Sequence, residues 1–246
     1  MANGKPLIRS YYVPSEDYAS STLAFFYWSI YQQRNAEPFY CVDTQGFFQR
    51  LLKANPTLHY LKEIPPTGTR LDTVADTAPV VSLLSLTSLR RAASALLQYN
   101  PQTNAEIASV LTNYGLARET FDVGIVLDVE GCVPRVVEQL TMLQARLDKA
   151  TLKVYVSTES IDLLREFAQK GHPSWSYLSL YREDAPTDAE FVFWRRLADL
   201  KLLQSQETLV LRLSSALGKL VYLTNPKLQL DSQVLSWDSS VWKPLV

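Results

Sequence analysis

Residues 121–160 read FDVGIVLDVE GCVPRVVEQL TMLQARLDKA TLKVYVSTES. The apolar runs at 121–127 and 152–156 have the length and composition of strands that are buried on both faces. The residues between them repeat apolar side chains at helical spacing, so that one side of the expected helix is apolar. Buried strands joined by amphipathic helices predict a parallel sheet, and the chain is therefore expected to have an α/β fold.

The same alternation continues toward the C-terminus. Helices are predicted after the strands, at residues 133–147, 159–170, 187–203 and 214–220. A capping box of Thr187 and Glu190 predicts the start of the longest of them. Residues 207–211 have the composition of another buried strand. We therefore expect residues 118–246 to form a Rossmann-like half.

The preceding residues, 1–117, predict a second Rossmann-like half with a helical connection. Its strands are expected at 8–13 and 39–42, and its helices at 18–34, 47–54, 80–99 and 103–117. The capping-box pair Thr103 and Glu106 predicts where the last of these helices begins. The polar stretch 65–79, which starts with two prolines, predicts a loop.

The charge balance argues against a broad nucleic-acid-binding surface. The chain has 246 residues, with 24 basic and 25 acidic side chains, a formal net charge of −1 and no run of five like charges. No apolar segment is long enough to span a membrane, and no signal peptide is visible at the start. These features predict a cytoplasmic protein.

Two cysteines and two histidines do not predict a metal site. Cys41 and Cys132 lie in or beside apolar, strand-like runs, so we expect free, buried thiols in a reducing compartment. His59 and His172 are isolated in the sequence and are expected to be structural or surface residues. Zinc-ligand spacing is missing from the sequence, and we expect neither a metal nor a cofactor.

Candidate functional residues lie directly after three of the predicted strands. One more lies in the helix before the third strand. In a parallel sheet the carboxyl ends of the strands share one edge, where open α/β proteins bind ligands. The residues expected at this edge are Asp128, Val129, Ser157, Thr158, Glu159, Asp199, Ser214 and Ser215. This edge is the predicted site of function.

The order of these motifs resembles the C-terminal half of the fucosyltransferase superfamily, whose two-domain fold is known as GT-B. The resemblance covers roughly residues 121–222. The family has a strand ending in Thr-Asp, then a helix ending in Asp-Leu, a strand and a Ser-Ser pair. Thr158-Glu159, Asp199-Leu200 and Ser214-Ser215 are similar to these elements, in this order.

The resemblance implies a reduced GT-B architecture with two Rossmann-like halves. It also implies which residues would contact a nucleotide sugar, linked to GDP or UDP, if the chain still binds one. These residues are Ser157, Thr158, Glu159, Asp199, Ser214 and Ser215. It does not assign a catalytic residue.

The first edge departs from the family pattern, Gly-x-His-x-Arg-Arg-x-Asp. Gly124 matches the glycine, but Val126 stands at the histidine, and Asp128 and Val129 stand at the two arginines. In the family those arginines clamp the donor diphosphate through charged, bidentate hydrogen bonds. A carboxylate reverses the sign of a contact worth about 4 kcal/mol at about 4 Å and an effective dielectric near 20. The resemblance therefore implies a degenerate phosphate site at these three positions, and the bulky, acidic turn at residues 14–18 departs in the same direction.

Other interpretations of the same residues remain open. Ser214 and Ser215 could be a plain helix N-cap, and Thr158-Glu159 could be a helix start with an acidic first turn. Asp128 with Glu130 could form a general-base pair, a Mg²⁺ site or a solvated acidic loop. Nucleophile-elbow, Walker and dinucleotide-binding glycine motifs are missing from the sequence.

Two functions from different classes follow. The first is a glycosyltransferase-like pseudoenzyme that has lost donor diphosphate binding and acts as a binding or structural component with a protein partner. Relatives of the family in large DNA viruses suggest a virion or an assembly as its setting. The alternative is an active cytosolic glycosyltransferase that holds its nucleotide sugar in another way. Affinity for GDP, UDP and their sugars distinguishes the two.

Overall fold

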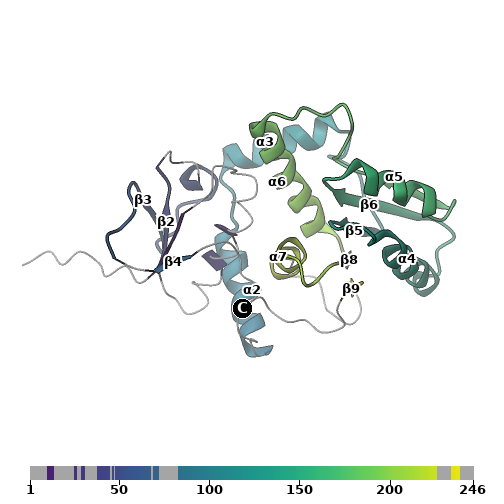
Figure 1. Cartoon of the computed structure of the whole chain (residues 1–246), viewed down its shortest axis with the longest axis horizontal. Helices are drawn as coiled ribbons and strands as arrows, with labels where there is room; N and C mark the ends of the chain where they lie inside the picture. Colours follow the sequence, from purple (N-terminus) through teal and green to yellow (C-terminus); the bar gives the residue numbers. More distant parts are fainter. Residues whose placement is uncertain are drawn as a thin grey trace, which may run out of the picture. The chain divides into compact units, whose positions relative to one another are not determined.

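The computed structural model describes residues 10–13, 25–26, 29–30, 38–44, 46, 48–67, 69–71, 83–225 and 234–238. The chain divides into two compact units, one within residues 1–105 and 244–246 and one within 106–243. Each unit contains its own parallel β-sheet (Figure 1). The predicted α/β fold with Rossmann-like parallel sheets is therefore confirmed.

The sheet of the first unit has the strand order β3-β2-β1-β4, and its neighbouring strands are parallel. Its strands are β1 (Ser10–Tyr12), β2 (Phe39–Val42), β3 (Leu58–Leu61) and β4 (Thr69–Leu71). Aromatic side chains fill the core beside this sheet, and the rings of Phe25 and Phe48 stack with centroids 4.4 Å apart. The strand expected at 39–42 is confirmed, whereas β4 lies in the stretch for which we predicted a loop.

Parts of the first unit's predictions fall outside the described residues. These are residues 8 and 9 of the first expected strand, the acidic turn 14–18, and most of the helix expected at 18–34. Within that helix, Phe25, Phe26, Ser29 and Ile30 are described, and all four are helical and buried. The short helix expected at 47–54 is a 3-10 turn, η1 (Phe48–Arg50).

Two helices follow the first sheet, α2 (Leu83–Leu96) and α3 (Pro101–Asn113). The predicted capping box at Thr103 is wrong, because Thr103 lies inside α3. Asn100 takes that role instead, and its side-chain oxygen accepts a hydrogen bond of 2.8 Å from the backbone N–H of Thr103. Asparagine is a strong N-cap, and Pro101 suits the first helical position because its missing N–H is not needed there.

The sheet of the second unit has the strand order β7-β6-β5-β8-β9 and is parallel throughout. Its strands are β5 (Val123–Leu127), β6 (Leu152–Thr158), β7 (Trp175–Leu178), β8 (Leu209–Leu211) and β9 (Val234–Ser236). The parallel sheet predicted from residues 121–127, 152–156 and 207–211 is confirmed. The two outermost strands, β7 and β9, were not predicted.

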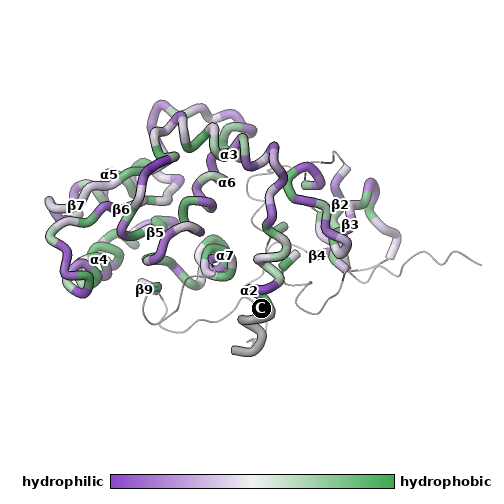
Figure 2. The backbone as a smooth tube through the Cα atoms, turned by 180° about the vertical axis from the view of Figure 1, so that it is seen from behind, coloured by the Kyte–Doolittle hydropathy of each residue, from purple (hydrophilic) through white to green (hydrophobic). Residues whose placement is uncertain are grey.

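Four helices cover this second sheet. They are α4 (Val133–Leu147), α5 (Ile161–Lys170), α6 (Ala189–Ser205) and α7 (Ala216–Thr224). The chain passes from β5 through β6 to β7 and then returns to β8 on the other side of β5. Right-handed crossovers therefore place the two helix pairs on opposite faces, and α4 indeed packs with α5 and α6 with α7. The colour along α4 and α5 changes repeatedly between hydrophobic and hydrophilic, as expected for amphipathic helices (Figure 2).

The start of α6 differs by one residue from the prediction. Asp188 caps the helix, and its carboxylate accepts a hydrogen bond of 2.8 Å from the backbone N–H of Phe191. The predicted cap, Thr187, precedes it and is exposed. Aspartate also favours this end because the helix dipole is positive there.

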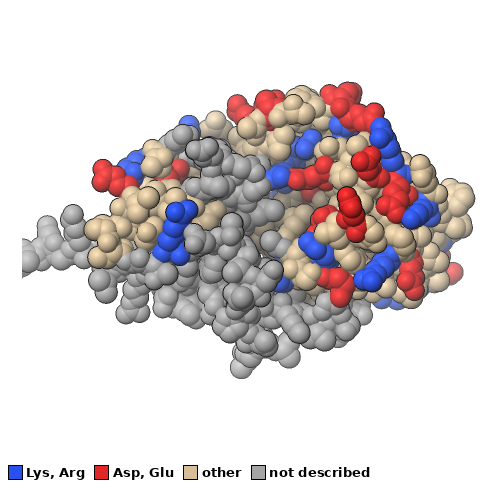
Figure 3. Space-filling view, in the orientation of Figure 1, with Lys and Arg blue, Asp and Glu red and all other residues tan. Residues whose placement is uncertain are grey.

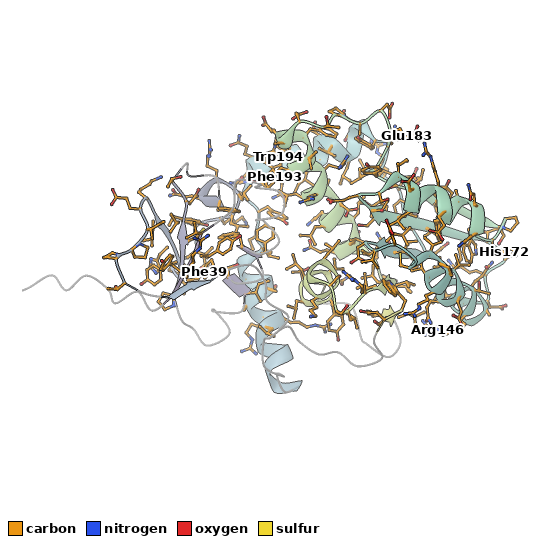
Figure 4. The ribbon with its side chains drawn as sticks, viewed as in Figure 1. Phe39, Arg146, His172, Glu183, Phe193 and Trp194 are labelled. Atoms are coloured by element: carbon orange, nitrogen blue, oxygen red, sulfur yellow. The ribbon has the colours of Figure 1, made fainter. Side chains whose placement is uncertain are left out.

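The cysteine prediction is confirmed, since Cys41 and Cys132 are free and buried. His59 and His172 are exposed, and His172 lies with Arg146 at the end of the second unit opposite to Phe193 (Figure 4). Tryptophans serve the core: Trp175 stacks on Phe167, and Trp237 packs against the apolar cluster beneath α4 and α5. Trp242 lies outside the described residues.

Candidate functional site

The second sheet reverses its strand order between β5 and β8. β6 pairs with β5 on one side, and β8, which the chain reaches from β7, pairs with it on the other. The helices that follow β5 and β8 lie on opposite faces of the sheet. Loops at the carboxyl ends of such strands diverge, and ligands of open α/β proteins bind there. Here Asp128 follows β5 and Arg212 follows β8, so this edge is the candidate site.

Asp128 and Arg212 form an ion pair across this edge. The Arg212 Nε donates to one carboxylate oxygen of Asp128 over 3.0 Å, and both side chains are largely buried. The other oxygen of Asp128 is buried without a well-formed hydrogen bond. Burial raises the pKa of Asp128, and the nearby Arg212 and Ser215 oppose that rise without cancelling it. The expected negative charge at the degenerate phosphate site is therefore balanced by a cation that sequence reasoning did not single out.

The serine pair after β8 has two different roles. Ser215 is the N-cap of α7, since its hydroxyl oxygen accepts 2.9 Å from the backbone N–H of Gly218. The same hydroxyl donates to the backbone carbonyl of Arg212 over 2.9 Å. Ser214 is exposed, and its backbone N–H donates to the carboxylate of Asp238 over 3.2 Å. The helix-cap interpretation thus describes what Ser215 does.

Asp199 and Ser157 come together on the α6 face of the sheet. The Ser157 hydroxyl donates to one oxygen of Asp199 over 2.5 Å, and the Tyr155 hydroxyl donates to the other. Burial raises the pKa of Asp199 to about 6, although both hydroxyl donors act against the rise, and nearby Glu159 adds to it. The sequence indicated Ser157 and Asp199, but not Tyr155, which is buried in the middle of β6.

Thr158 and Glu159 lie just before α5 and not within it. The Thr158 hydroxyl oxygen accepts 3.1 Å from the backbone N–H of Ser160, and Ser160 caps the helix. The predicted helix start at 159 is therefore two residues early. Glu159 forms an ion pair with Arg196 of α6, with an Nη2–Oε2 distance of 2.6 Å. The carboxylate of Glu159 consequently joins the loop after β6 to α6.

The other two residues of the expected degenerate phosphate site, Val126 and Val129, are apolar and pack in the interior. Val126 is buried within β5, and Val129 is partly buried against the apolar cluster beneath α4 and α5. Glu130 is exposed, whereas Asp128 forms an ion pair with Arg212. The contacts of Asp128 therefore do not support an acidic pair of Asp128 and Glu130. Among the described residues, no cluster of three or more His, Cys, Asp and Glu side chains could hold a metal ion.

The surface of the second unit carries charges of both signs. Lys and Arg atoms are interspersed with Asp and Glu atoms on the face of the second unit that Figure 3 shows. Such mixing gives no continuous basic patch on that face. Of the helices in the described part of the chain, none is long and apolar enough to cross a lipid bilayer.

Known structures resemble this chain over nearly its whole length. The fucosyltransferase NodZ from Bradyrhizobium superposes with a TM-score of 0.50 at 12% identity, covering 89% of this chain and 94% of that chain. The NodZ α-1,6-fucosyltransferase soaked with GDP-fucose gives a TM-score of 0.51, again at 12% identity with the same coverage. A variant of Arabidopsis thaliana FUT1 in complex with GDP gives 0.51 at 10% identity, covering 91% of this chain and 70% of that chain.

The sequence comparisons add no closer relative. No known family profile matches the chain, and no curated protein matches its sequence. At 10% and 12% identity the structural likeness shows the fold alone. The chain therefore has a glycosyltransferase-like fold of the fucosyltransferase, GT-B kind.

Proposed function

We propose that this protein is a glycosyltransferase-like pseudoenzyme that holds no donor diphosphate at the carboxyl edge of its second sheet. In this proposal it acts as a binding or structural component with a protein partner. The observation that carries the proposal is the ion pair between Asp128 and Arg212. Arg212 is a cation suited to binding phosphate, but it forms an ion pair with Asp128 of the same chain.

A diphosphate that used Arg212 would have to displace Asp128. One oxygen of Asp128 is already buried without a well-formed hydrogen bond, so losing Arg212 would leave a largely buried carboxylate with little compensation. Leaving a buried polar acceptor unpaired costs roughly 1–3 kcal/mol, and a charged acceptor costs more. Asp128 would also repel the incoming phosphate. Both effects lower the affinity for a nucleoside diphosphate relative to a site with unpaired arginines.

Calorimetric titration of the wild-type protein with GDP, UDP and their sugars tests the proposal. We expect no heat of binding up to millimolar ligand. Micromolar affinity for any of these compounds would overturn the proposal and favour an active transferase.

The Asp128→Asn variant tests the physical reason. It removes the charge that competes for Arg212 and keeps the shape of the side chain, so its affinity for GDP should rise by about tenfold over the wild type. Asp148→Asn is the matched control, because Asp148 is exposed after α4, before the amino end of β6, and the charge change is the same. An equal response of the two variants would show that net charge, not Arg212, limits binding.

A second candidate function is an active glycosyltransferase using a GDP- or UDP-linked sugar. The observation in its favour is Asp199, because a carboxyl group with a pKa of about 6 is suited to proton transfer near neutral pH. Its two oxygens, however, already accept hydrogen bonds from Ser157 and Tyr155. Sugar transfer from a nucleotide sugar that is lost in Asp199→Asn would support this alternative.

The proposed setting is cytoplasmic, with association with a virion or another assembly as its specific form. The virion setting rests on the family resemblance alone. Copurification of the chain with virus particles, followed by protease protection inside them, would test it.

A further inference from the structure

The last described strand returns the chain to the candidate edge. β9 lies beside β8 (Figure 1). The two strands are parallel, with Ser236 opposite Leu211. The backbone N–H of Trp237 continues this pairing by donating to the carbonyl of Leu211 over 3.2 Å. Asp238 therefore arrives beside the turn that joins β8 to α7.

The carboxylate of Asp238 accepts hydrogen bonds from two consecutive backbone N–H groups of that turn. Leu213 donates to one oxygen over 3.0 Å, and Ser214 donates to the other over 3.2 Å. The Ser236 hydroxyl adds a third hydrogen bond of 2.8 Å. Partial burial acts to raise the pKa of Asp238, but the donors at Ser214, Ser236 and Leu213 together lower it, so the group is held as an anion.

This contact is not needed to cap the helix. Ser215 already caps α7, with its hydroxyl oxygen 2.9 Å from the backbone nitrogen of Gly218. The N–H groups of Leu213 and Ser214 lie before that cap, in the turn itself. Successive backbone N–H groups that converge on one anion, at the start of a helix and at the carboxyl edge of a parallel sheet, are the arrangement that binds phosphate oxygens.

The residue before Asp238, Trp237, carries a donor without an acceptor, and it packs against the apolar cluster beneath α4 and α5. Its indole Nε1 is buried and has no hydrogen-bond partner. Arg212, at the start of the same turn, is engaged by Asp128. The cationic and the backbone donors of this edge are thus each occupied by a carboxylate of the chain itself.

We propose that Asp238 makes an autoinhibitory contact: its carboxylate occupies the turn 212–215 in place of a phosphate group, and residues 234–238 form a strap that holds it there. The inference rests on the proposed function, in which the wild-type protein holds no diphosphate at this edge. In this inference the backbone N–H groups of Leu213 and Ser214 can still bind a phosphate, and the carboxylate of Asp238 blocks them. The ligand class is inorganic phosphate, pyrophosphate or the diphosphate of a nucleotide.

The test is titration of Asp238→Ala with pyrophosphate at constant ionic strength. The variant should bind pyrophosphate about tenfold more tightly than the wild type, because two backbone donors are freed. The amide proton resonances of Leu213 and Ser214 should shift on binding. The matched control, Asp148→Asn, should behave as the wild type does.

Two further variants keep the test decisive. Asp238→Asn preserves the shape of the side chain and removes its charge, and it should show a smaller gain of the same sign even if Asp238→Ala fails to fold. Ser236→Ala removes one hydrogen bond from the strap and should give a gain of about twofold. Unchanged pyrophosphate affinity in folded Asp238→Asn would overturn the strap. Tight binding of GDP by the wild type would instead overturn the proposed function, so the two failures can be told apart.

Discussion

The carboxyl group of Asp199 is stabilised mainly by two hydroxyl groups of one strand. Tyr155 and Ser157 point to the same face of β6, since they are two residues apart, and each donates to a different oxygen. Neutral donors stabilise the charged form less than burial disfavours it, and the pKa of Asp199 therefore rises to about 6. Burial thus raises the pKa of a residue that was chosen from its place in the sequence.

Replacing Asp199 by Asn should reduce the pH dependence of the free energy of unfolding. The folded-state pKa of about 6 lies above the usual value of 3.8, so the native protein binds more protons than the unfolded chain between these values. The resulting stabilisation is complete below the unfolded pKa and is lost as the pH rises through the folded pKa. This component is on the order of 3 kcal/mol, and it should vanish in the variant.

Urea unfolding at several pH values measures this effect. The wild type should lose stability relative to Asp199→Asn as the pH rises from about 4 to about 7. Asp148→Asn is the control, because Asp148 adopts a left-handed conformation, φ 51°, that asparagine tolerates. If Asp199→Asn keeps the wild-type slope, another group titrates in this range and the assignment to Asp199 fails.

At the scale of elements, hydrophobic pattern predicted what is long and buried. Residues 121–127 and 133–147 correspond closely to β5 and α4, because their apolar side chains repeat at the spacing of a strand and of a helix. β4 and β9 have three residues each, too few for a period to appear. β1 and β8 are as short, but they lie in longer runs of apolar or aromatic residues, which predicted them. In β7 three of four residues are exposed, so its pattern is that of a surface segment. Such strands are specified by their neighbours in the sheet.

The candidate site was predictable to the same extent. Asp128 and Ser215 follow predicted strands, and the topology of a parallel sheet brings such positions to one edge. Asp199 lies within the predicted helix before the third strand. Their partners could not be predicted: Arg212 pairs with a residue 84 positions away, and Asp238 reaches Leu213 across 25. Both contacts depend on the order of β5, β8 and β9, and no local pattern encodes that order.

Gly218 in α7 is required by the turn that precedes the helix. A Cβ atom at this position would lie 2.2 Å from the backbone carbonyl oxygen of Arg212, which cannot move without displacing the turn. Gly218→Ala should therefore destabilise the protein by roughly 1–3 kcal/mol, although alanine favours a helix over glycine by about 1 kcal/mol. Ala168→Gly, at an exposed position of α5, is the comparison and should cost about 1 kcal/mol. Chemical denaturation measures both, and a stabilising Gly218→Ala would show that the turn is not held as described.

At the scale of the molecule, each unit has a parallel sheet and an apolar core of its own. The structural likeness to the fucosyltransferases extends over 89% of the chain, so it includes both units. A fold shared at this level leaves the chemistry to the loops at the sheet edges, and those of the second unit are closed by Asp128 and Asp238 in the structure. The scaffold and the proposed loss of donor binding are therefore compatible.

The two cysteines provide one natural probe in each unit. Cys41 lies in β2 of the first sheet, and Cys132 lies in the core of the second unit beside α4. Burial raises the pKa of both thiols, which disfavours the reactive thiolate as well as access. In the native protein a bulky thiol reagent should therefore label neither residue rapidly.

Pulsed labelling through a urea titration, read by mass spectrometry, should then report the unfolding of each unit separately. Because the units have separate cores, Gly218→Ala should lower the urea midpoint for labelling of Cys132 and leave that of Cys41 unchanged. The wild type, labelled in parallel, supplies the reference midpoints. Equal shifts for the two thiols would mean that the units unfold as one cooperative body, and rapid labelling of either thiol without urea would contradict its burial. In the expected case the second unit, which carries the candidate site, owes its stability to its own sheet and helices.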